Sequence, residues 1–415
     1  MIHYIGFYNE PGDIDERKPL KSFASTEKMN YIASILSRKN KVRIISPGFS
    51  TFNSIFKEKR VKKRKFEVIY LSACGDGKDA LTIKKIIWGA REIKNYITKF
   101  VEVDDKIIFY STPAMWLFLR NTLMRYEWIL ELEEIYYYDK SKINPIRYAY
   151  KLLENDAIRN SKKIIYVSET LKKKVGKDGI VVYGPFESCE EDEKIVNHGR
   201  IDKSINVLYT GSIDKVRGAF TLAEAFAQIS EKRSFQDKIK VCFVGYFHGK
   251  HAYDQRKEFT TILEFINRNG IEALFKENLS SEEIQEEIRS SDICVMPQKI
   301  NCRFSEYSFP SKLPRYLSYG KLVVSSAIKP VMESPFKKFI IPYYSDELES
   351  LIDALVKSFE SFSSEKFSVQ NKELRDELKM IISNQEKVLL DFFEYWCTIV
   401  IGKCILFKRY KKQLY

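Results

Sequence analysis

Residues 303–326, which read RFSEYSFPSKLPRYLSYGKLVVSS, decide the fold that the rest of the chain must follow. Turn-forming residues fill the first part, and apolar residues then recur at helical spacing over 311–319. Gly320 ends this helix before a short apolar strand at 322–325. The stretch therefore predicts a loop, a short helix and a buried strand, which is a repeating unit of an α/β domain.

The start of the predicted helix is a candidate phosphate site. Ser308 or Ser311 can cap it, and Pro310 and Pro314 suit its first turn. The backbone N–H groups of that turn have no partner within the helix and point together into the preceding loop, where they would attract a phosphate. A helix–strand unit without any ligand fits the same residues, so both interpretations stay open.

The order FPSKL at 309–313, then Tyr-Leu, then YGKLVV resembles the donor-site helix of GT-B glycosyltransferases, in particular the retaining family-4 enzymes. In that family the helix N-terminus holds the diphosphate of a nucleotide sugar, and a glutamate in the second turn binds the ribose. Arg315 stands at that position here. The family's other motif glutamate falls on Tyr307, with Glu306 beside it.

A second match begins at Val207, where the chain reads VLYTGSIDKVRG, in the order strand, glycine loop and then an alanine-rich helix. Gly211 would let a phosphate approach the backbone closely. Against the family's Gly-Arg-x-x-x-x-Lys-Gly, Ser212 takes the place of the arginine and Arg217 that of the lysine, with Lys215 two residues before it. Ordinary surface charge is the other interpretation of these two cations.

The resemblance implies a donor site in the second half of the chain. Its catalytic groups would be Arg217, Lys215 and Lys312, which stabilise charge on the departing diphosphate without a protein nucleophile. The residues implied to bind the donor are Gly211, Ser212, Tyr246, Glu306, Ser308, Phe309, Pro310, Ser311, Leu313 and Arg315.

In the first half, short β-branched or aromatic runs alternate with longer amphipathic stretches, which predicts parallel strands joined by crossover helices and covered on both faces. The predicted strands are 2–7, 42–46, 68–71, 106–111, 128–132, 164–168 and 180–183. The long polar loop at 8–25 follows the first strand and is interpreted as functional, because active sites lie at the carboxyl ends of parallel strands.

Two acids mark the segment LELEEIYYYD at 130–139 as a candidate acceptor site. Glu131 and Glu133 share one face of an extended chain, so both could hold a sugar hydroxyl. A glutamate at a strand end is also often solvated or paired with a cation, and that interpretation remains.

The predicted fold class is α/β of the GT-B type: two Rossmann-like, doubly wound parallel-sheet domains facing a central cleft. We expect an acceptor domain at 1–185, an acidic linker at 186–204, a nucleotide-sugar domain at 205–380 and a C-terminal helix at 381–415. The resemblance implies that this helix crosses back to the first domain, and an apolar stripe that includes Leu389 and Phe393 predicts that it packs there.

Composition fits a two-domain globular protein of 415 residues, of which 44% are hydrophobic. Seven cysteines without a C-x-x-C pair indicate neither a disulfide framework nor a zinc site. His248 and His251 have the spacing of metal ligands on a helix. Asp254 is the one further candidate ligand nearby, which is too few for a typical metal site. No metal and no cofactor are expected, and no apolar run is long enough to cross a membrane.

The net charge of +13 predicts an anionic partner. The segment KEKRVKKRK at 57–65 follows an apolar group formed by Phe49, Phe52, Ile55 and Phe56, whose spacing suits one helix face. Basic and aromatic residues together predict contact with an anionic membrane surface. A solvated charged face is the alternative, and no nucleic-acid recognition module accompanies the charge.

The sequence thus predicts a cytoplasmic glycosyltransferase, peripheral to the inner face of the cell membrane. It would move a sugar from a nucleotide-diphosphate sugar to a hydroxyl of a glycan or lipid-linked glycan in cell-surface polysaccharide assembly. A non-catalytic GT-B subunit that binds a glycan or a protein is the alternative, because Arg315 and Ser212 replace two residues of the family's donor site.

Overall fold

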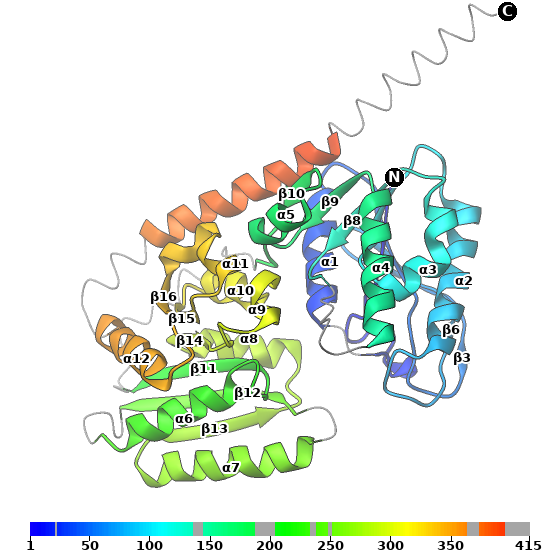
Figure 1. Cartoon of the computed structure of the whole chain (residues 1–415). Helices are drawn as coiled ribbons and strands as arrows, with labels where there is room; N and C mark the ends of the chain where they lie inside the picture. Colours follow the sequence, from blue (N-terminus) through cyan, green and yellow to red (C-terminus); the bar gives the residue numbers. More distant parts are fainter. Residues whose placement is uncertain are drawn as a thin grey trace, which may run out of the picture. The chain divides into compact units, whose positions relative to one another are not determined.

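A computed structural model describes residues 1–20, 23–135, 144–186, 204–232, 238–247, 251–362 and 373–394 (Figure 1). These residues divide into two compact units. Unit 1 comprises residues 1–185 with the described residues from 383 onward, and unit 2 comprises residues 186–382. The predicted linker at 186–204 lies almost entirely outside the described residues.

Unit 1 is built on an eight-stranded sheet in which all neighbours are parallel except β4 and β5. In sheet order its strands are β10 (Gly179–Val181), β9 (Lys163–Tyr166), β8 (Trp128–Leu132), β7 (Lys106–Tyr110), β1 (Ile2–Ile5), β2 (Val42–Ser46), β5 (Glu67–Tyr70) and β4 (Lys59–Lys62). The seven strands predicted from apolar runs all form.

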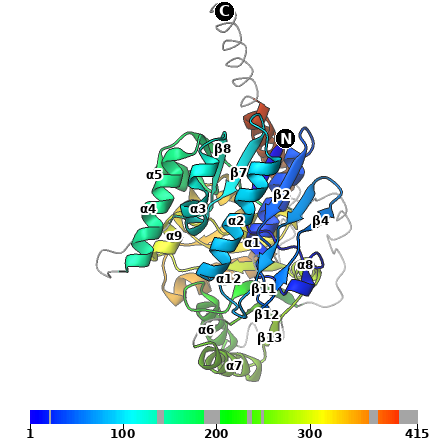
Figure 2. The same cartoon turned by 90° about the vertical axis from the view of Figure 1, so that its right-hand side faces the viewer.

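Helices cover both faces of this sheet, because alternate residues of its strands are buried on opposite sides (Figure 2). Ile2, Tyr4 and Ile129 share one buried cluster with helix α1 (Phe23–Leu36). On the other side Trp128 contacts Trp116 of helix α3 with ring centroids 4.9 Å apart. The helices of unit 1 after α1 are α2 (Ile83–Phe100), α3 (Pro113–Leu123), α4 (Pro145–Asn160) and α5 (Glu169–Val175).

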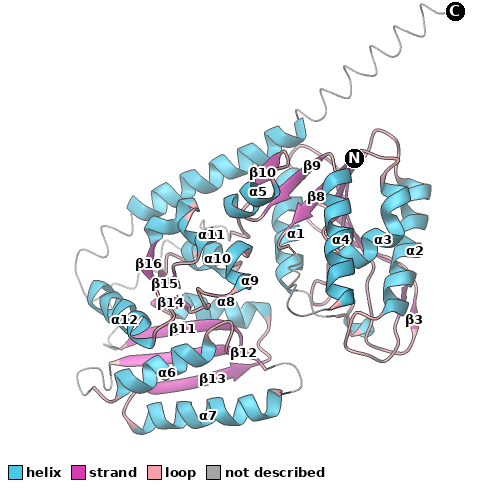
Figure 3. Ribbon diagram, viewed as in Figure 1, coloured by secondary structure: helices cyan, strands magenta, loops and turns pink. Residues whose placement is uncertain are grey.

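Unit 2 holds a six-stranded, fully parallel sheet. Its order is β13 (Glu272–Glu277), β12 (Ile239–Tyr246), β11 (Ile205–Ser212), β14 (Ile293–Met296), β15 (Leu322–Ser326) and β16 (Ile340–Tyr343). Its helices are α6 (Ala219–Ser230), α7 (Ala252–Arg268), α8 (Ser281–Ser290), α9 (Arg303–Tyr307), α10 (Lys312–Ser318), α11 (Lys329–Met332) and α12 (Leu348–Phe362), coloured as helices in Figure 3.

Two parallel sheets flanked by helices confirm the predicted α/β class. The core of unit 2 joins α6, α7 and α12 to the sheet through large side chains such as Phe226, Phe259 and Leu355, all fully buried. The sequence did not predict β13 and β16, since EALFKE has charged ends and IIPY contains a proline. Among the described helices, none has the length and apolar character that crossing a bilayer requires.

The predicted helix through Phe49, Phe52, Ile55 and Phe56 is wrong. Phe49 is buried and packs against Phe7 with ring centroids 5.1 Å apart, and Ile55–Phe56 forms the short strand β3, paired with β6 (Ala73–Cys74). The following basic segment is β4, the edge strand of the sheet. The turn residues around Ser50 and Ser54 prevent a continuous helix here.

Residues 373–394 form a helix whose later part belongs to unit 1. Leu389 and Phe393 join the buried cluster around α1, and the Gln385 amide accepts from the Tyr183 backbone N–H at 2.7 Å and donates to its carbonyl at 2.9 Å. The packing predicted for this stripe is present in its described part. The remainder of the predicted helix, with Trp396, lies outside the described residues.

We expect Gln385→Ala to destabilise unit 1 by about 1–3 kcal/mol, because it leaves the two buried polar groups of Tyr183 without these partners. The four tryptophans of the chain, Trp88, Trp116, Trp128 and Trp396, lie outside 186–382, so their fluorescence during denaturation follows unit 1. Lys387→Ala, at an exposed position of the same helix, is the control. Equal transition midpoints for the two variants would contradict the role of the amide.

Candidate donor and acceptor sites

Two glycines leave the backbone without side chains at the carboxyl end of the unit 2 sheet, and we call this place the glycine floor. Gly211 of β11 and Gly245 of β12 are register partners. A Cβ atom on Gly245 would lie 1.8 Å from the Gly211 carbonyl oxygen, and Gly211 has a φ of 145°, which disfavours any side chain. Only glycine fits at both positions, so backbone is exposed where other strands carry side chains.

The Lys312 ammonium lies over this floor. A Cβ atom on Gly211 would be 2.2 Å from Lys312 Nζ, and the ammonium donates to the Thr210 carbonyl oxygen. The Thr210 hydroxyl is hydrogen-bonded to the Tyr316 hydroxyl at 2.7 Å, so both ends of α10 are tied to β11. The structure therefore brings together Gly211 and Lys312, two predicted site residues that are about a hundred positions apart in the sequence.

The two other predicted cations differ in their surroundings. The Arg217 guanidinium lies 4.9 Å from the ring centroid of Phe304 in α9, and its backbone N–H donates to Asp214 at 2.6 Å. Lys215 instead pairs with Glu258 of α7 at 2.8 Å, and this carboxylate raises the pKa of the Lys215 ammonium. Arg217 is thus held against the helix that precedes α10, whereas Lys215 is engaged with α7.

The loop predicted at 303–310 is partly helical, since α9 occupies Arg303–Tyr307. The Ser305 hydroxyl donates to the Lys299 carbonyl and accepts from Gln298 at 2.7 Å, which fixes this turn to the preceding loop. Glu306 is exposed on α9, where its carboxylate accepts from the Tyr307 hydroxyl. The helix places Glu306 on the solvent side of the connection.

The predicted serine caps are wrong. Ser308 ends α9, and Ser311 precedes α10 with a helical backbone and no side-chain hydrogen bond to it. A side-chain cap normally needs an extended backbone at this position, which Ser311 lacks. Phe309 and Leu313 are buried, and Phe309 packs against Phe336 with ring centroids 6.1 Å apart. These two apolar residues position the loop by packing in the interior.

The remaining predicted donor residues surround the same carboxyl edge. Ser212 pairs in register with Tyr246, whose side chain is half exposed at the end of β12. The Ser212 carbonyl accepts from the Tyr209 hydroxyl at 2.7 Å. Pro310 accepts from the Leu313 backbone N–H at 3.1 Å, and Arg315 lies in the last turn of α10.

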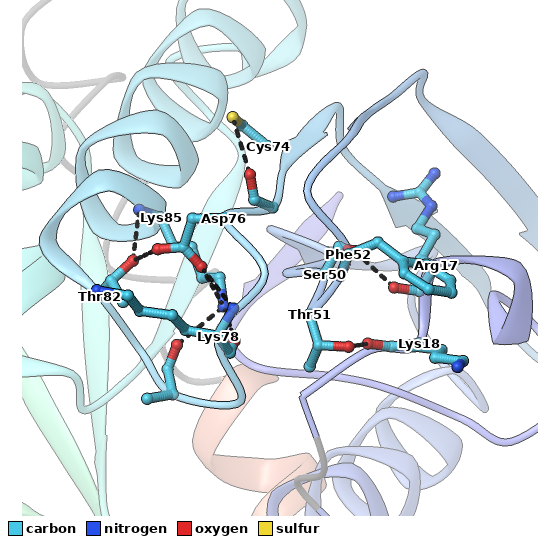
Figure 4. Close-up of polar contacts among 12 residues, drawn as sticks. Arg17, Lys18, Ser50, Thr51, Phe52, Cys74, Asp76, Lys78, Thr82 and Lys85 are labelled. Atoms are coloured by element: carbon cyan, nitrogen blue, oxygen red, sulfur yellow. Dashed lines mark hydrogen bonds and ion pairs between the residues drawn. The ribbon is translucent and has the colours of Figure 1, made fainter.

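At the carboxyl edge of unit 1, Arg17 organises the long loop that follows β1. It is almost fully buried and donates to the carbonyls of Leu71 at 3.0 Å and Lys57 at 2.6 Å, and burial lowers the pKa of its guanidinium. The Ser50 hydroxyl donates to the Arg17 carbonyl at 2.6 Å (Figure 4). This role could not be predicted from the sequence, because one arginine in a polar stretch has no distinguishing pattern.

A second polar group in Figure 4 closes the loop before α2. Asp76 accepts from the Thr82 hydroxyl at 2.5 Å and pairs with the buried Lys85 ammonium at 3.0 Å. The hydrogen bond from Thr82 has the largest effect and, together with that from Lys85, lowers the pKa of Asp76 to about 2. The carboxylate therefore stays ionised and holds the N-terminus of α2 in place.

The predicted acceptor residues Glu131 and Glu133 lie at the end of β8 in unit 1. Glu131 is fully buried and accepts from the Tyr4 hydroxyl, whereas Glu133 is partly exposed and lies 3.8 Å from the buried Lys28 ammonium. Burial, together with the Glu133 charge, raises the pKa of Glu131 to about 8. Glu131 is therefore not the solvated surface residue that the sequence also allowed.

In the part of the chain that the structure describes, no group of three or more His, Cys, Asp or Glu side chains is placed so that it could hold a metal ion. His248 lies outside that part, and His251 precedes α7.

Residues 190–363 match the model of the family described as Glycosyl transferases group 1. No curated relative matches the chain. Among solved structures, the sucrose-phosphate synthase of Thermosynechococcus elongatus is 13% identical, with a TM-score of 0.71 over 97% of this chain and 99% of that chain.

Two further structures share the fold. A trehalose-phosphate synthase (UDP-forming) of Burkholderia xenovorans, solved in complex with glucose-6-phosphate, is 10% identical, with a TM-score of 0.67 over 96% of this chain and 99% of that chain. An E. coli structure described as trehalose-6-phosphate bound with UDP-2-fluoro glucose is 12% identical, with a TM-score of 0.68 over 95% and 98% of the two chains.

The fold is therefore that of the GT-B proteins, with two Rossmann-like units. Residues 190–363, which contain the glycine floor and Lys312, are the part that matches the group 1 glycosyl transferase model, and the chain is a glycosyltransferase.

We expect Gly245→Ala to cost unit 2 about 1–3 kcal/mol or more, because the new methyl group meets the rigid Gly211 carbonyl and forces β11 and β12 apart. Circular dichroism during denaturation measures the loss. Lys240→Ala on the same strand removes a surface ion pair with Glu272 without adding bulk, and it serves as the control. A stable Gly245→Ala protein with an unchanged transition would refute the packing argument.

Proposed function

We propose that the chain transfers a sugar, with retention of its anomeric configuration, from a nucleotide-diphosphate sugar to a hydroxyl of a glycan or lipid-linked glycan in cell-surface polysaccharide assembly. The observation that carries the proposal is the Lys312 ammonium over the floor formed by Gly211 and Gly245. A diphosphate needs a cation and bare backbone at a strand's carboxyl end, and this place offers both.

The chemistry proposed for this site is electrostatic. The bond between the sugar C1 and a diphosphate oxygen breaks, the acceptor oxygen bonds to C1, and the acceptor proton passes to the departing diphosphate. Lys312 and Arg217 would stabilise the negative charge that develops on the diphosphate, and a fixed charge does this without reorganisation. No metal or further cofactor enters the proposal, since these two cations supply the positive charge.

The nucleoside end of the donor would lie near Tyr246 and Glu306. Tyr246 presents a half-exposed ring at the end of β12, beside Ser212. Glu306 is an exposed carboxylate that can accept from ribose hydroxyls. The Arg315 guanidinium has only hydrogen-bond donors, so it cannot accept from ribose hydroxyls as the family's glutamate does. We assign Arg315 the role of adding positive charge near a phosphate.

The proposed acceptor presents hydroxyl groups to Glu133. A partly exposed carboxylate accepts hydrogen bonds from sugar hydroxyls, and it repels a phosphate. A sugar phosphate is the second candidate, favoured by the glucose-6-phosphate in the Burkholderia xenovorans structure. The charge of Glu133 makes a neutral glycan surface the better fit.

The decisive experiment measures transfer from a panel of nucleotide sugars to glycan, lipid-linked and sugar-phosphate acceptors. Lys312→Ala and Arg217→Ala should each lose about 1.5–3 kcal/mol of transition-state binding, the value of a charged hydrogen bond, and so lower kcat/KM by roughly 10- to 100-fold. Lys257→Ala, an exposed lysine of α7, controls for the change in net charge.

Two outcomes would count against the proposal. If no nucleotide sugar gives heat in calorimetry with folded protein and a lipid acceptor present, the chain is a non-catalytic subunit that binds a glycan or a protein. If transfer occurs but both alanine variants retain full kcat/KM, the diphosphate lies elsewhere.

We also propose that the protein docks on the inner face of the cell membrane through β4 and its neighbours. Five cations of this segment are exposed: Lys57, Arg60, Lys62, Arg64 and Lys65. Lys59, Arg60 and Lys63 are paired with Glu16, Glu58 and Asp13, so these three add little to the field. Exposed Phe52 and Ile55 precede the basic strand and can enter the headgroup layer.

Sedimentation with anionic liposomes tests this surface. Binding should fall with salt and should be lost when Lys57, Lys62, Arg64 and Lys65 are replaced by glutamine, at about 1 kcal/mol for each charge. Replacing Lys257, Lys329, Lys337 and Lys357, four exposed lysines of unit 2, changes the net charge equally and should leave most binding intact. Equal binding by the two quadruple variants would exclude this segment as the docking surface.

A further inference from the structure

Two glutamates near the end of β8 each have a buried carboxyl oxygen without a hydrogen-bond partner within the described ranges. Among the described residues, the few buried side-chain oxygens that lack a hydrogen-bond partner include Oε1 of Glu131 and Oε1 of Glu133. Glu131 and Glu133 are two positions apart near the end of β8, and burial together with the charge on Glu133 raises the pKa of Glu131. Two ionised carboxylates have acceptors only and cannot bond, whereas a proton on one of them satisfies both oxygens.

Charge balance leads to the same result. Lys28 of α1 is buried and lies 3.8 Å from Glu133, and it donates to the Val182 carbonyl. The cluster would carry a net negative charge if both carboxyl groups were ionised, and burying that charge is costly. One proton on the pair leaves one carboxylate opposite one ammonium, which is neutral.

Tyr4 and Lys28, which also face the pair, lower the pKa of Glu131, but burial and the charge on Glu133 outweigh them. Tyr4 of β1 donates its hydroxyl to Glu131, and burial with the nearby Glu131, Glu133 and Tyr110 raises the pKa of Tyr4 far above its usual range, so this hydroxyl keeps its proton. Tyr110 ends β7 as the register partner of Glu131. Lys28 is the cation that faces the pair from α1.

We propose that Glu131 and Glu133 share one proton, which makes Glu131 a neutral positioning residue that holds the Glu133 carboxylate toward the acceptor. Tyr4 donates to Glu131, Glu131 donates to Glu133, and the charge rests on Glu133, which is partly open to solvent and paired with Lys28. Raising the pH removes the shared proton, and two adjacent carboxylates then repel one another. The role toward the acceptor rests on the proposed function, whereas the shared proton does not.

The proton itself can be observed without any substrate. Infrared difference spectra between neutral and alkaline pH should show the C=O stretch of a carboxylic acid in the wild type. Glu131→Gln should lose this band. Glu133→Gln should lose it too, because Glu131 then ionises as the partner of Lys28. Glu134→Gln, at the exposed neighbour, should keep it. A wild type without the band at neutral pH would overturn the proposal.

Stability supplies the second measurement, with a definite sign. The folded pKa of Glu131 is raised from its ordinary 4.5 to about 8, so the folded state holds a proton that the unfolded state has lost. The wild type is therefore destabilised as the pH rises between these values, and its unfolding constant should grow tenfold more per pH unit than that of Glu131→Gln. Parallel pH dependences for the two proteins would overturn the shared proton.

Kinetics test the positioning role. Glu131→Gln keeps both hydrogen bonds, so it should keep the acceptor KM at neutral pH and abolish the alkaline rise of that KM in the wild type. Glu131→Ala removes both bonds and should raise the acceptor KM at least tenfold with the donor KM unchanged. If the infrared band shows the shared proton but neither variant changes the acceptor KM, the shared proton stands. Glu133 is then not the group that binds the acceptor.

Discussion

The bond from the Lys312 ammonium to the Thr210 carbonyl is the interaction on which the candidate site of unit 2 depends. It exists only because Gly211 has no side chain, since a Cβ atom would occupy the place of the ammonium. The same bond, with that between Thr210 and Tyr316, fixes α10 relative to β11. A cation, bare backbone and the end of a central strand are thereby held in one rigid arrangement.

The sequence predicted the elements of this arrangement better than its contacts. Apolar runs predicted the central strands because both faces of a parallel sheet are buried, so the strands need no alternation. The edge strands β4 and β13 were not predicted, because KRVK and EALFKE each resemble a solvated segment. The stretch at 303–326 predicted α10 and β15, but α9 depends on the contacts of Ser305 with Gln298 and Lys299 in the loop just before it.

Side-chain environments were the least predictable part of both candidate sites. Glu131 is an ionisable residue in WILEL, and nothing in that pattern says that its side chain meets Tyr4 or that Lys28 pairs with the nearby Glu133. Lys215 and Arg217 are two positions apart, yet one pairs with α7 and the other lies on Phe304. Such differences arise from tertiary neighbours, which a single sequence does not display.

The two borders of the eight-stranded sheet have a consequence for how copies of the protein meet. An open sheet ends in unpaired backbone groups, which invite a strand from another molecule. One border here is β10, with three residues, and the other is β4, with three cations among its four residues. A second copy adding to β4 would place like charges side by side. The basic strand therefore keeps the sheet from growing between molecules.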